Sequence, residues 1–499
     1  MPEIPHRILL MEPPFYRLYK DSYSIALFPL SLGYLSGVIL RETDWQAMAY
    51  NADFNPPGES IKVQYLTGEG HQNYLRTIKD PSEKIWEEIR SMIREYCPSV
   101  VGISSKTQNY ASACMVAQLA KEVDEKITVI VGGPHASMVG TEILKCPHID
   151  LGVRGEGEIT IIEILSALEK GKGFRGIRGV FYREDGQEVV NDPREFITDL
   201  DTLPFPHQSA PKVLKDYDQY PVSAFMKVIS IRGCPHNCQF CASREIWSRK
   251  PRFRSPANVI SEIKSLQKLG VTLIRFDDDT FGVNKKYISD LCQALMEHCP
   301  GIRWDCEIHV TLVEDQIISL MKRAGCYQIQ IGVESGNNQI LREIRKNTTI
   351  EAALAASQTI KKHHIRVQAY FMVGFPQETE ETLRDTVAAM KKIKCDLLEY
   401  SIFTPNPGTE TFELCKAQGL IGDDYNVSLY GHQSPANHFC MNIPFERFRV
   451  LVSEIEKMVD RKNTLNRIKM IFSLSTLKKI QMYGIWNSLQ KGIKLLSNK

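Results

Sequence analysis

The chain has 499 residues, long enough for two or three domains, with the hydrophobic (43%) and charged (24%) content of an ordinary soluble globular protein. A net charge of +2 gives no argument for nucleic acid or for an acidic partner. The first seven residues show no signal peptide and no run of 18 apolar residues marks a membrane span, so we expect a cytoplasmic protein.

Short apolar runs alternate with helical patterns over the first 170 residues. The runs predict strands at Arg7–Met11, Gln46–Ala52, Val100–Ser104, Thr128–Gly132 and Ile149–Val153, and helices at Leu30–Arg41, Glu83–Tyr96, Tyr110–Val123 and Glu158–Glu169. Short, continuous apolar runs are typical of buried parallel strands. The pattern predicts a doubly wound, Rossmann-like α/β domain whose ligand lies at the carboxyl ends of the strands.

Small and polar residues follow three of these strands. They are Ser104 and Ser105, then Gly132, Gly133 and Pro134, and finally Gly155 and Glu156. Glycine lets a bulky, flat ligand approach the backbone closely. The tight turns of any α/β domain would use the same residues, so ligand binding and simple turns both stay open here.

Two segments follow the first domain in the sequence, one turning at a glycine and the other rich in proline. A hairpin is predicted around Asp185-Gly186. The stretch 199–206 predicts an extended linker, because proline disfavours helix in the residue before it. We therefore expect an α/β domain over 1–198, a linker over 199–221, a core over 222–412, and a mostly helical region over 413–499.

The core shows six strand–helix units from Phe225 onward. Their strands are predicted at about 225–231, 272–276, 302–308, 327–333, 366–373 and 396–403. Six parallel strands predict a partial (β/α)6 barrel with its site on the carboxyl-terminal face.

Three cysteines, Cys234, Cys238 and Cys241, follow the first strand of the core. Three thiolates this close can converge on one soft metal centre. Four cysteines would close a [4Fe–4S] cluster, so three leave one iron open, as in catalytic metal centres. A zinc site that adds His236 is the alternative. The other ten cysteines have no paired spacing and are expected to be reduced, buried small residues.

The stretch 233–241 resembles the cluster loop of the radical S-adenosylmethionine (SAM) superfamily, including the aromatic Phe240 before the last cysteine. The resemblance implies that the three cysteines bind a [4Fe–4S] cluster and that SAM chelates the open iron. An electron from a donor of ferredoxin or flavodoxin type then cleaves SAM to a 5′-deoxyadenosyl radical. Later segments match the family in order, and the SAM contacts that they imply are Phe240, Asp277, Asp278, Glu334, Ser335 and Gly374. A solvated acidic loop is the alternative for the aspartates.

The first domain resembles the cobalamin-binding domain that precedes the radical SAM core in one large subgroup. This implies that Ser104, Ser105, Gly132, Gly133, Pro134, Gly155 and Glu156 contact cobalamin. The Asp-x-His-x-x-Gly loop, which supplies a histidine to cobalt in many cobalamin proteins, is absent. His135 lacks that motif, so we expect no cobalt ligand from it.

Residues for substrate chemistry are less defined. Glu307 and His309 alternate onto one face of a predicted strand, and with Tyr370 they are candidates for handling substrate protons. A purely structural role is the alternative. Four basic residues after the cysteines either bind an anion or form a solvated loop: Arg249, Lys250, Arg252 and Arg254.

The resemblance implies a cobalamin-dependent radical SAM enzyme that methylates an unactivated carbon of a small-molecule substrate through methylcobalamin. A cyclisation or rearrangement without methyl transfer, as in the oxygen-independent magnesium-protoporphyrin cyclase group, is the alternative. A tRNA methylthiotransferase is disfavoured because its second cysteine triad is missing: Cys97, Cys114 and Cys146 are widely spread. A cobalamin sensor without activity would leave the cysteine triad unexplained.

The end of the chain is basic, with nine Lys or Arg and no acidic residue after Asp460. Apolar residues recur there at steps of four and three, from Met482 through Trp486 to Leu496. We expect the apolar face to pack on the barrel with the basic residues in water, because a helix that follows a barrel core usually covers it. Peripheral membrane contact, for which a basic amphipathic helix is also typical, is the alternative.

Overall fold

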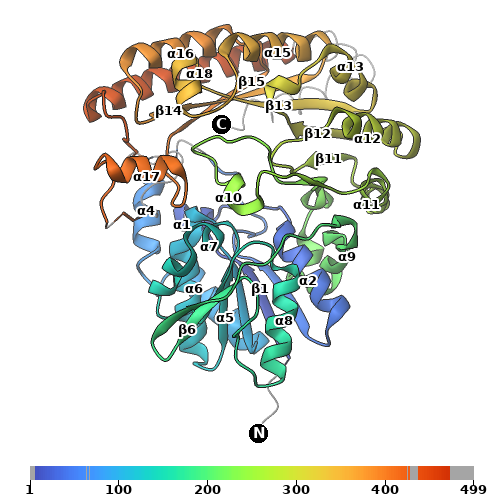
Figure 1. Ribbon diagram of the computed structural model, residues 1–499, viewed down its shortest axis with the longest axis vertical. Helices are drawn as coiled ribbons and strands as arrows, with labels where there is room; N and C mark the ends of the chain where they lie inside the picture. Colours follow the sequence, from blue (N-terminus) through green and yellow to red (C-terminus); the bar gives the residue numbers. More distant parts are fainter. Residues whose placement is uncertain (1–5, 63–64, 67, 424, 427–436, 472–499) are drawn as a thin grey trace. The chain divides into compact units, whose positions relative to one another are not determined.

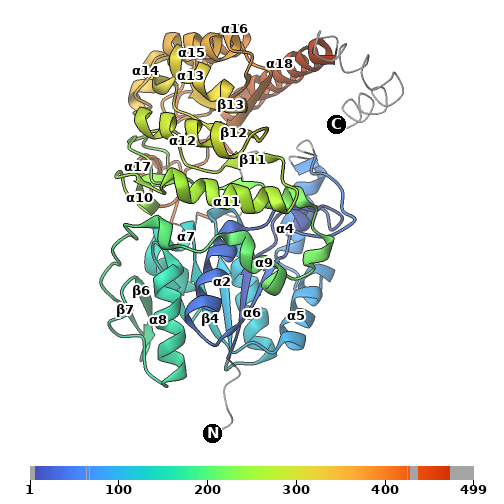
Figure 2. The same cartoon turned by 90° about the vertical axis from the view of Figure 1, so that its right-hand side faces the viewer.

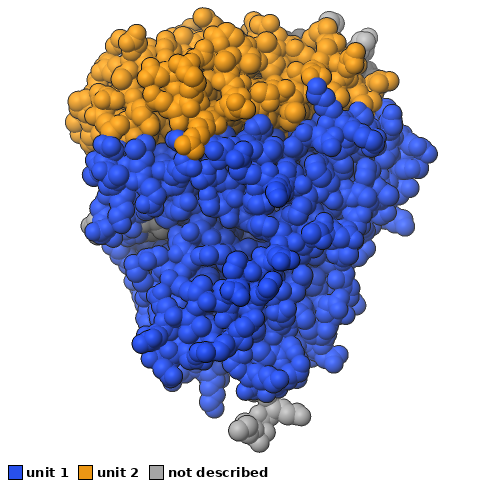
Figure 3. All heavy atoms as spheres, viewed as in Figure 1, with its two compact units in different colours: residues 1–306, 404–437 blue, residues 307–403, 438–499 orange. Residues whose placement is uncertain are grey.

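The computed structural model describes the chain except for residues 1–5, 63–64, 67, 424, 427–436 and 472–499. It contains two compact units, drawn in different colours in Figure 3. Unit 1 comprises residues 1–306 and 404–437, and unit 2 comprises residues 307–403 and 438–499. The apolar positions of the predicted tail, from Met482 to Leu496, lie outside the described residues.

Unit 1 begins with a seven-stranded sheet in the order β2-β1-β3-β4-β5-β6-β7. Strands β1 to β5 pair in parallel, whereas β6 and β7 add an antiparallel edge. The strands are β1 (Arg7–Glu12), β2 (Gln46–Asn51), β3 (Val100–Ser104), β4 (Thr128–Gly132), β5 (Leu151–Val153), β6 (Val180–Glu184) and β7 (Gln187–Val190). All seven strands were predicted from the sequence. The parallel pairing of β1 to β5 confirms the predicted doubly wound arrangement.

Helices cover both faces of this sheet (Figures 1 and 2). Helices α2 (Leu30–Glu42) and α8 (Gly157–Glu169) lie on one face, and α5 (Lys84–Tyr96) and α6 (Tyr110–Val123) lie on the other. The short helices α1 (Tyr16–Tyr19), α4 (Glu69–Thr77) and α7 (Pro134–Val139) were not predicted. Because both faces are covered, the central strands are buried throughout, as in Ile8–Met11 of β1.

The stretch 199–206, predicted to be extended, contains a 3₁₀ turn at Leu200–Thr202 and ends at Pro206, where helix α9 (Pro206–Val213) begins. The remainder of the predicted linker 199–221 thus contains this helix and a second 3₁₀ turn at Tyr217–Gln219. Pro206 takes the first helical position, where a missing N–H costs nothing. A Cβ on Gly37 of α2 would lie 2.7 Å from Cγ of Pro204, so the prolines pack closely on this helix. The predicted domain boundaries remain a prediction.

Unit 1 also holds the first half of the core. Strands β8 (Lys227–Val228) and β12 (Arg303–Glu307) flank β11 (Leu273–Phe276) in parallel. Helices α11 (Pro256–Lys268) and α12 (Lys285–His298) follow, and the ribbon of β9 (Ile231–Arg232) and β10 (Arg252–Phe253) is antiparallel. Two short helices complete it: α10 (Ser243–Trp247) and α17 (Glu410–Ala417).

Unit 2 holds the second half. Strands β13 (Cys326–Glu334), β14 (Arg366–Val373) and β15 (Leu397–Ile402) pair in parallel. The helices are α13 (Asp315–Arg323), α14 (Asn338–Glu343), α15 (Ile350–Lys362), α16 (Glu380–Lys392) and α18 (Phe445–Ile471). All six predicted core strands are therefore present, and α18 confirms a helical C-terminal region. None of the described helices combines the length and apolar character that crossing a membrane requires.

Candidate cluster and cofactor site

The three cysteines lie in unit 1, in the loop between β9 and α10. Cys238 is buried, and Cys234 and Cys241 are half-buried. Burial raises the pKa of Cys241 to about 12, and the neighbouring Cys238, Asp279 and Cys234 add to this increase. Both other cysteines of the triad thus affect the ionisation of Cys241. A buried thiol of this kind ionises when a metal supplies positive charge, so the loop fits a cluster.

The zinc alternative requires ligands that converge on one ion. Within the described ranges, no three His, Cys, Asp or Glu side chains are arranged to hold a single metal ion. An iron–sulfur cube differs because each thiolate binds a different iron. The lack of such a group therefore does not count against a cluster bound by the three cysteines.

Arg244 and the start of α17 brace the cluster loop. The Arg244 guanidinium donates to Oδ1 of Asn237 at 2.6 Å and forms an ion pair with Glu410 at 2.7 Å. The backbone N–H of Thr411 donates to the carbonyl oxygen of Gln239 at 3.3 Å. Residues from both ends of the core thus fix the loop that carries the cysteines.

Asp278 fixes the backbone where β8 turns into β9. Its carboxylate accepts from the N–H of Ser230 at 2.6 Å, from the Ser230 hydroxyl at 2.6 Å and from the N–H of Ile231 at 2.9 Å. The sequence predicted a SAM contact for Asp278, and that role remains a prediction. The neighbouring Asp277, which is also a predicted SAM contact, is half-buried and forms an ion pair with Lys227 at 2.9 Å.

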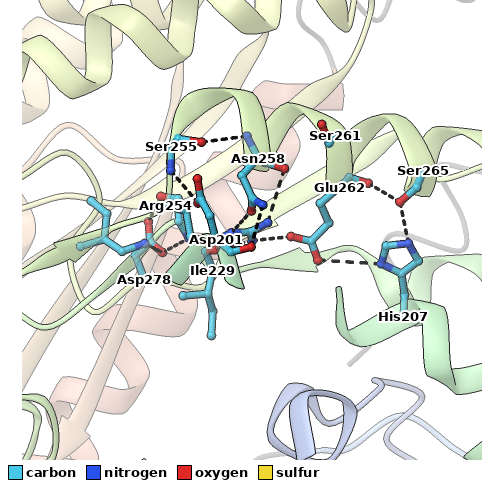
Figure 4. Close-up of polar contacts among 12 residues, drawn as sticks. Asp201, His207, Ile229, Arg254, Ser255, Asn258, Ser261, Glu262, Ser265 and Asp278 are labelled. Atoms are coloured by element: carbon cyan, nitrogen blue, oxygen red, sulfur yellow. Dashed lines mark hydrogen bonds and ion pairs between the residues drawn. The ribbon is translucent and has the colours of Figure 1, made fainter. Parts of the chain in front are cut away.

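Arg254 holds the same turn from the other side (Figure 4). Its guanidinium donates to the carbonyl oxygen of Ile229 at 2.9 Å and forms a buried ion pair with Glu262. His207 lies beyond Glu262, and its Nε2 is 2.6 Å from the Ser265 hydroxyl. Arg254 is only 4% exposed, so the solvated-loop interpretation is wrong for this residue.

Burial raises the pKa of Asp278 to about 7, well above the usual value for an aspartate. The folded protein therefore holds this proton more strongly than the unfolded chain does. The resulting stability is present at low pH and is lost as the pH rises through about 7.

We expect Asp278→Asn, whose amide can form hydrogen bonds with the same three groups, to remove this loss of stability between low and high pH. Thermal midpoints at pH 5 and pH 8 measure it, and Asp277→Asn is the matched control. A wild-type pH slope in Asp278→Asn would contradict the assignment.

Glu334 and Lys346 form an ion pair at the end of β13, in unit 2. Nζ of Lys346 lies 2.7 Å from Oε1 of Glu334, and both side chains are largely buried. A Cβ on Gly332 would lie 2.6 Å from that oxygen and 2.9 Å from Nζ of Lys346. Gly332 thus leaves the room that the pair needs. The sequence did not predict Lys346, although a buried glutamate calls for a cationic partner.

We expect Glu334→Ala to weaken SAM binding, because a carboxylate that accepts from ribose hydroxyls makes charge-assisted hydrogen bonds. The loss should be about 1.5–3 kcal/mol, or roughly 10- to 150-fold in Kd. Calorimetry on the protein with an intact cluster measures it. Glu351→Gln, a change at an exposed glutamate of the same unit, is the control. Unchanged affinity in Glu334→Ala would count against the predicted contact.

The other predicted SAM residues have structural partners within their own units. The Ser335 hydroxyl lies 3.2 Å from that of Thr386. The N–H of Gly374 donates to the buried Glu378 at 2.5 Å, and Gly374 has a φ of +93°. Phe240 is half-buried in the cluster loop. Their contacts with SAM remain predictions.

The candidates for substrate protons also have internal partners. Nδ1 of His309 lies 2.7 Å from the Thr311 hydroxyl, and its Nε2 lies 3.1 Å from the carbonyl oxygen of Lys346. The Tyr370 hydroxyl donates to Oε1 of Gln330 at 2.7 Å. Glu307 is half-buried at the end of β12. These contacts favour a structural role for His309, which lies beyond the strand.

The predicted cobalamin residues meet at one edge of the seven-stranded sheet, because β3, β4 and β5 are parallel. Ser105 is buried, and its N–H donates to the carbonyl oxygen of Gly132 at 2.8 Å. Gly133 has a φ of +93°, and a Cβ there would lie 2.9 Å from the carbonyl oxygen of Ser105. A Cβ on Gly155 would meet no atom within 4 Å. The edge is therefore tight at Gly133 and open at Gly155, where a bulky ligand can approach.

Three further residues belong to this edge. Ser104 is half-buried, with its hydroxyl 3.2 Å from that of Ser31, and Pro134 begins α7. His135 is buried, and its Nδ1 lies 3.2 Å from the Thr107 hydroxyl. Burial lowers the pKa of His135 to about 4, so the ring is neutral. The expectation that His135 is not a cobalt ligand remains a prediction.

Glu156 lies at the same edge, but its carboxylate is already paired with two arginines. It forms ion pairs with Arg232 at 2.6 Å and with Arg252 at 2.9 Å. Arg232 also pairs with Glu158 at 2.6 Å, and all three side chains of this pairing are at most 8% exposed. Arg252 is therefore not in a solvated loop. The sequence did not predict Arg232, although a charged residue at the end of the apolar run Val228–Ile231 indicates a buried partner.

Comparison with known proteins agrees with these observations. The Radical SAM superfamily model matches residues 228–390, and the B12 binding domain model matches residues 50–165. An uncharacterized methyltransferase of Pyrococcus horikoshii is 31% identical over 83% of this chain and 84% of its own length. The chain belongs to the cobalamin-binding radical SAM family. The predicted family, fold class, enzyme class and three cofactors are thereby confirmed.

Two further similarities are informative. The anaerobic magnesium-protoporphyrin IX monomethyl ester cyclase of Rubrivivax gelatinosus is 28% identical over 70% of this chain and 64% of its own length. The radical SAM methyltransferase TsrM of Kitasatospora setae, solved with cobalamin and a [4Fe–4S] cluster bound, has a TM-score of 0.67 at 16% identity. That similarity covers 91% of this chain and 89% of TsrM, and it concerns the fold alone.

Proposed function

We propose that the protein is a cobalamin-dependent radical SAM methyltransferase that transfers a methyl group to a carbon of a small-molecule substrate. The observation that carries the proposal is the direct connection, within unit 1, between the cluster loop and the glycine-rich edge. Arg232 precedes Gly233-Cys234 and is bound to Glu156 and Glu158 at that edge. Methyl transfer to a substrate radical needs both cofactors beside one substrate.

A second contact joins the core to the region of the glycine-rich edge. Gly408, in the segment that leads to α17, has a φ of +86°, and a Cβ there would lie 2.9 Å from the carbonyl oxygen of Met138 in α7. When bound, the cluster and SAM supply the radical, and cobalamin supplies the methyl group. The residues of this chain bind and orient the cofactors. Cys234, Cys238 and Cys241 are proposed to hold the cluster, and the edge from Ser104 to Gly155 to hold cobalamin.

The proposal includes two partners and a location. The electron donor is a protein of ferredoxin or flavodoxin type, and the substrate is a small molecule of unidentified class. All thirteen cysteines are free of disulfides, which suits a reducing compartment such as the cytoplasm.

The test is an anaerobic reaction of the reconstituted protein with SAM and a reductant. A methyltransferase should form S-adenosylhomocysteine and 5′-deoxyadenosine together, and the former should disappear when cobalamin is omitted. The cyclase-like alternative, favoured by the Rubrivivax relative, would give 5′-deoxyadenosine alone. Formation of neither product would overturn the proposal.

The absence of a histidine ligand to cobalt is tested separately. We expect the bound cobalamin to show a histidine-off electronic spectrum that His135→Ala leaves almost unchanged, because this buried ring is held by Thr107 and Tyr110. Thr107→Ala, which removes one contact of the ring, is a matched control. A large spectral change in His135→Ala would make His135 a ligand.

A further inference from the structure

The segment Ser248–Pro251 folds back onto the first turn of the cluster loop. Gly233 has a φ of +103°, and a Cβ there would lie 3.4 Å from backbone atoms of Ser248, Lys250 and Pro251. The Arg249 guanidinium donates to the carbonyl oxygen of Pro235, with Nη2 at 3.3 Å and Nε at 3.4 Å. The Arg249 side chain thus lies beside the loop between Cys234 and Cys238, and the backbone of Lys250 lies beside Gly233, just before that loop.

These two residues differ from the other basic residues around the loop. Arg232, Arg244, Arg252 and Arg254 each form an ion pair with a carboxylate. Arg249 and Lys250 are exposed, and neither forms an ion pair with any residue that the structure describes. Two exposed positive charges without a carboxylate partner among the described residues therefore lie next to the start of the cluster loop.

An electron has to reach the cluster from outside the protein, and electron transfer slows steeply with distance. The donor must therefore touch the surface close to the cysteines. Positive charge at such a surface steers and orients a partner that carries negative charge. Neither residue is needed to hold the fold by ion pairing, so their charge is available to a partner.

We propose that Arg249 and Lys250 form the docking site of an acidic one-electron carrier protein of the flavodoxin type. The proposal rests on the proposed function. The reduced carrier loses one electron, and the oxidised [4Fe–4S] cluster gains it. No covalent bond forms or breaks in this step.

The experiment compares two reductants on the reconstituted full-length protein: reduced flavodoxin, which must dock, and dithionite, which is small and need not. The readout is the rate of 5′-deoxyadenosine formation from SAM at low and high salt. We expect Lys250→Glu and the double variant Arg249→Glu/Lys250→Glu to lower the flavodoxin-driven rate at least about tenfold at low salt. With dithionite, Lys250→Glu should match the wild type. The matched control Lys170→Glu/Lys172→Glu changes the charge equally at exposed lysines elsewhere in unit 1.

Several results would overturn either the docking site or the proposed function. A flavodoxin-driven rate that is unaffected by charge reversal, or is independent of salt in the wild type, would overturn the docking site. Loss of the dithionite-driven rate in Lys250→Glu would also overturn it, because the residue would then act on the cluster loop. A wild-type protein that forms no 5′-deoxyadenosine even with dithionite would instead overturn the proposed function.

Discussion

Cys238→Ala should abolish the formation of 5′-deoxyadenosine from SAM. Cys238 is buried in the cluster loop and supplies one of only three thiolates for the proposed cluster. Without it one iron of the cluster has no protein ligand, and we expect a cluster held by only two cysteines to be lost together with its open, SAM-binding iron. Cys234→Ala and Cys241→Ala should give the same result.

The measurement is iron and labile sulfide content together with product formation under anaerobic conditions. Cys97→Ala is the control, because Cys97 is exposed at the end of α5 and outside the loop. Near-normal product from Cys238→Ala would mean that Cys238 is not a cluster ligand.

Arg232→Ala should destabilise unit 1 by about 3–5 kcal/mol. Burial by itself lowers the pKa of Arg232, but the carboxylates of Glu158 and Glu156 raise it overall, so the guanidinium stays charged. Removing it leaves two buried carboxylates without their main partner, and such uncompensated charges are costly. The guanidinium also lies over the Tyr34 ring, 5.0 Å from its centroid, so packing is lost as well.

Chemical denaturation measures this effect, and hydrogen exchange of residues 233–241 locates it. Arg178→Ala is the control, since Arg178 and Glu195 are both well exposed and their pair should contribute less than about 1 kcal/mol. Adding Glu156→Gln and Glu158→Gln to Arg232→Ala should recover part of the loss, because the buried charges disappear. A loss below that of Arg178→Ala would contradict a stabilising role.

Most elements of the fold could be predicted because buried parallel strands appear as short, continuous apolar runs. The runs at Val100–Ser104 and Thr128–Gly132 are strands with the expected bounds. Helix α9 was missed because proline was taken only as a helix breaker, whereas Pro206 starts the helix.

The cluster loop could be predicted because its three cysteines are close in the sequence. The partners of the charged residues could not be predicted, because these partners come from distant segments of the chain. Arg232 and Glu156 are 76 positions apart, and Arg252, for which a solvated loop was one of two interpretations, pairs with Glu156 from 96 positions away. Sequence spacing contains no information about such pairs, whereas burial in the structure shows them directly.

The shared carboxylate of Glu156 limits how this enzyme can be recombined with its relatives. A chimera joined within residues 199–221 would combine the first domain of one protein with the core of another. Such a chimera would separate Glu156 and Glu158 from Arg232 and Arg252, whose charges compensate each other only within the same protein. Donor and acceptor sequences should therefore be chosen with matching acidic and basic residues at these four positions, and exchanges that ignore them should give unstable proteins.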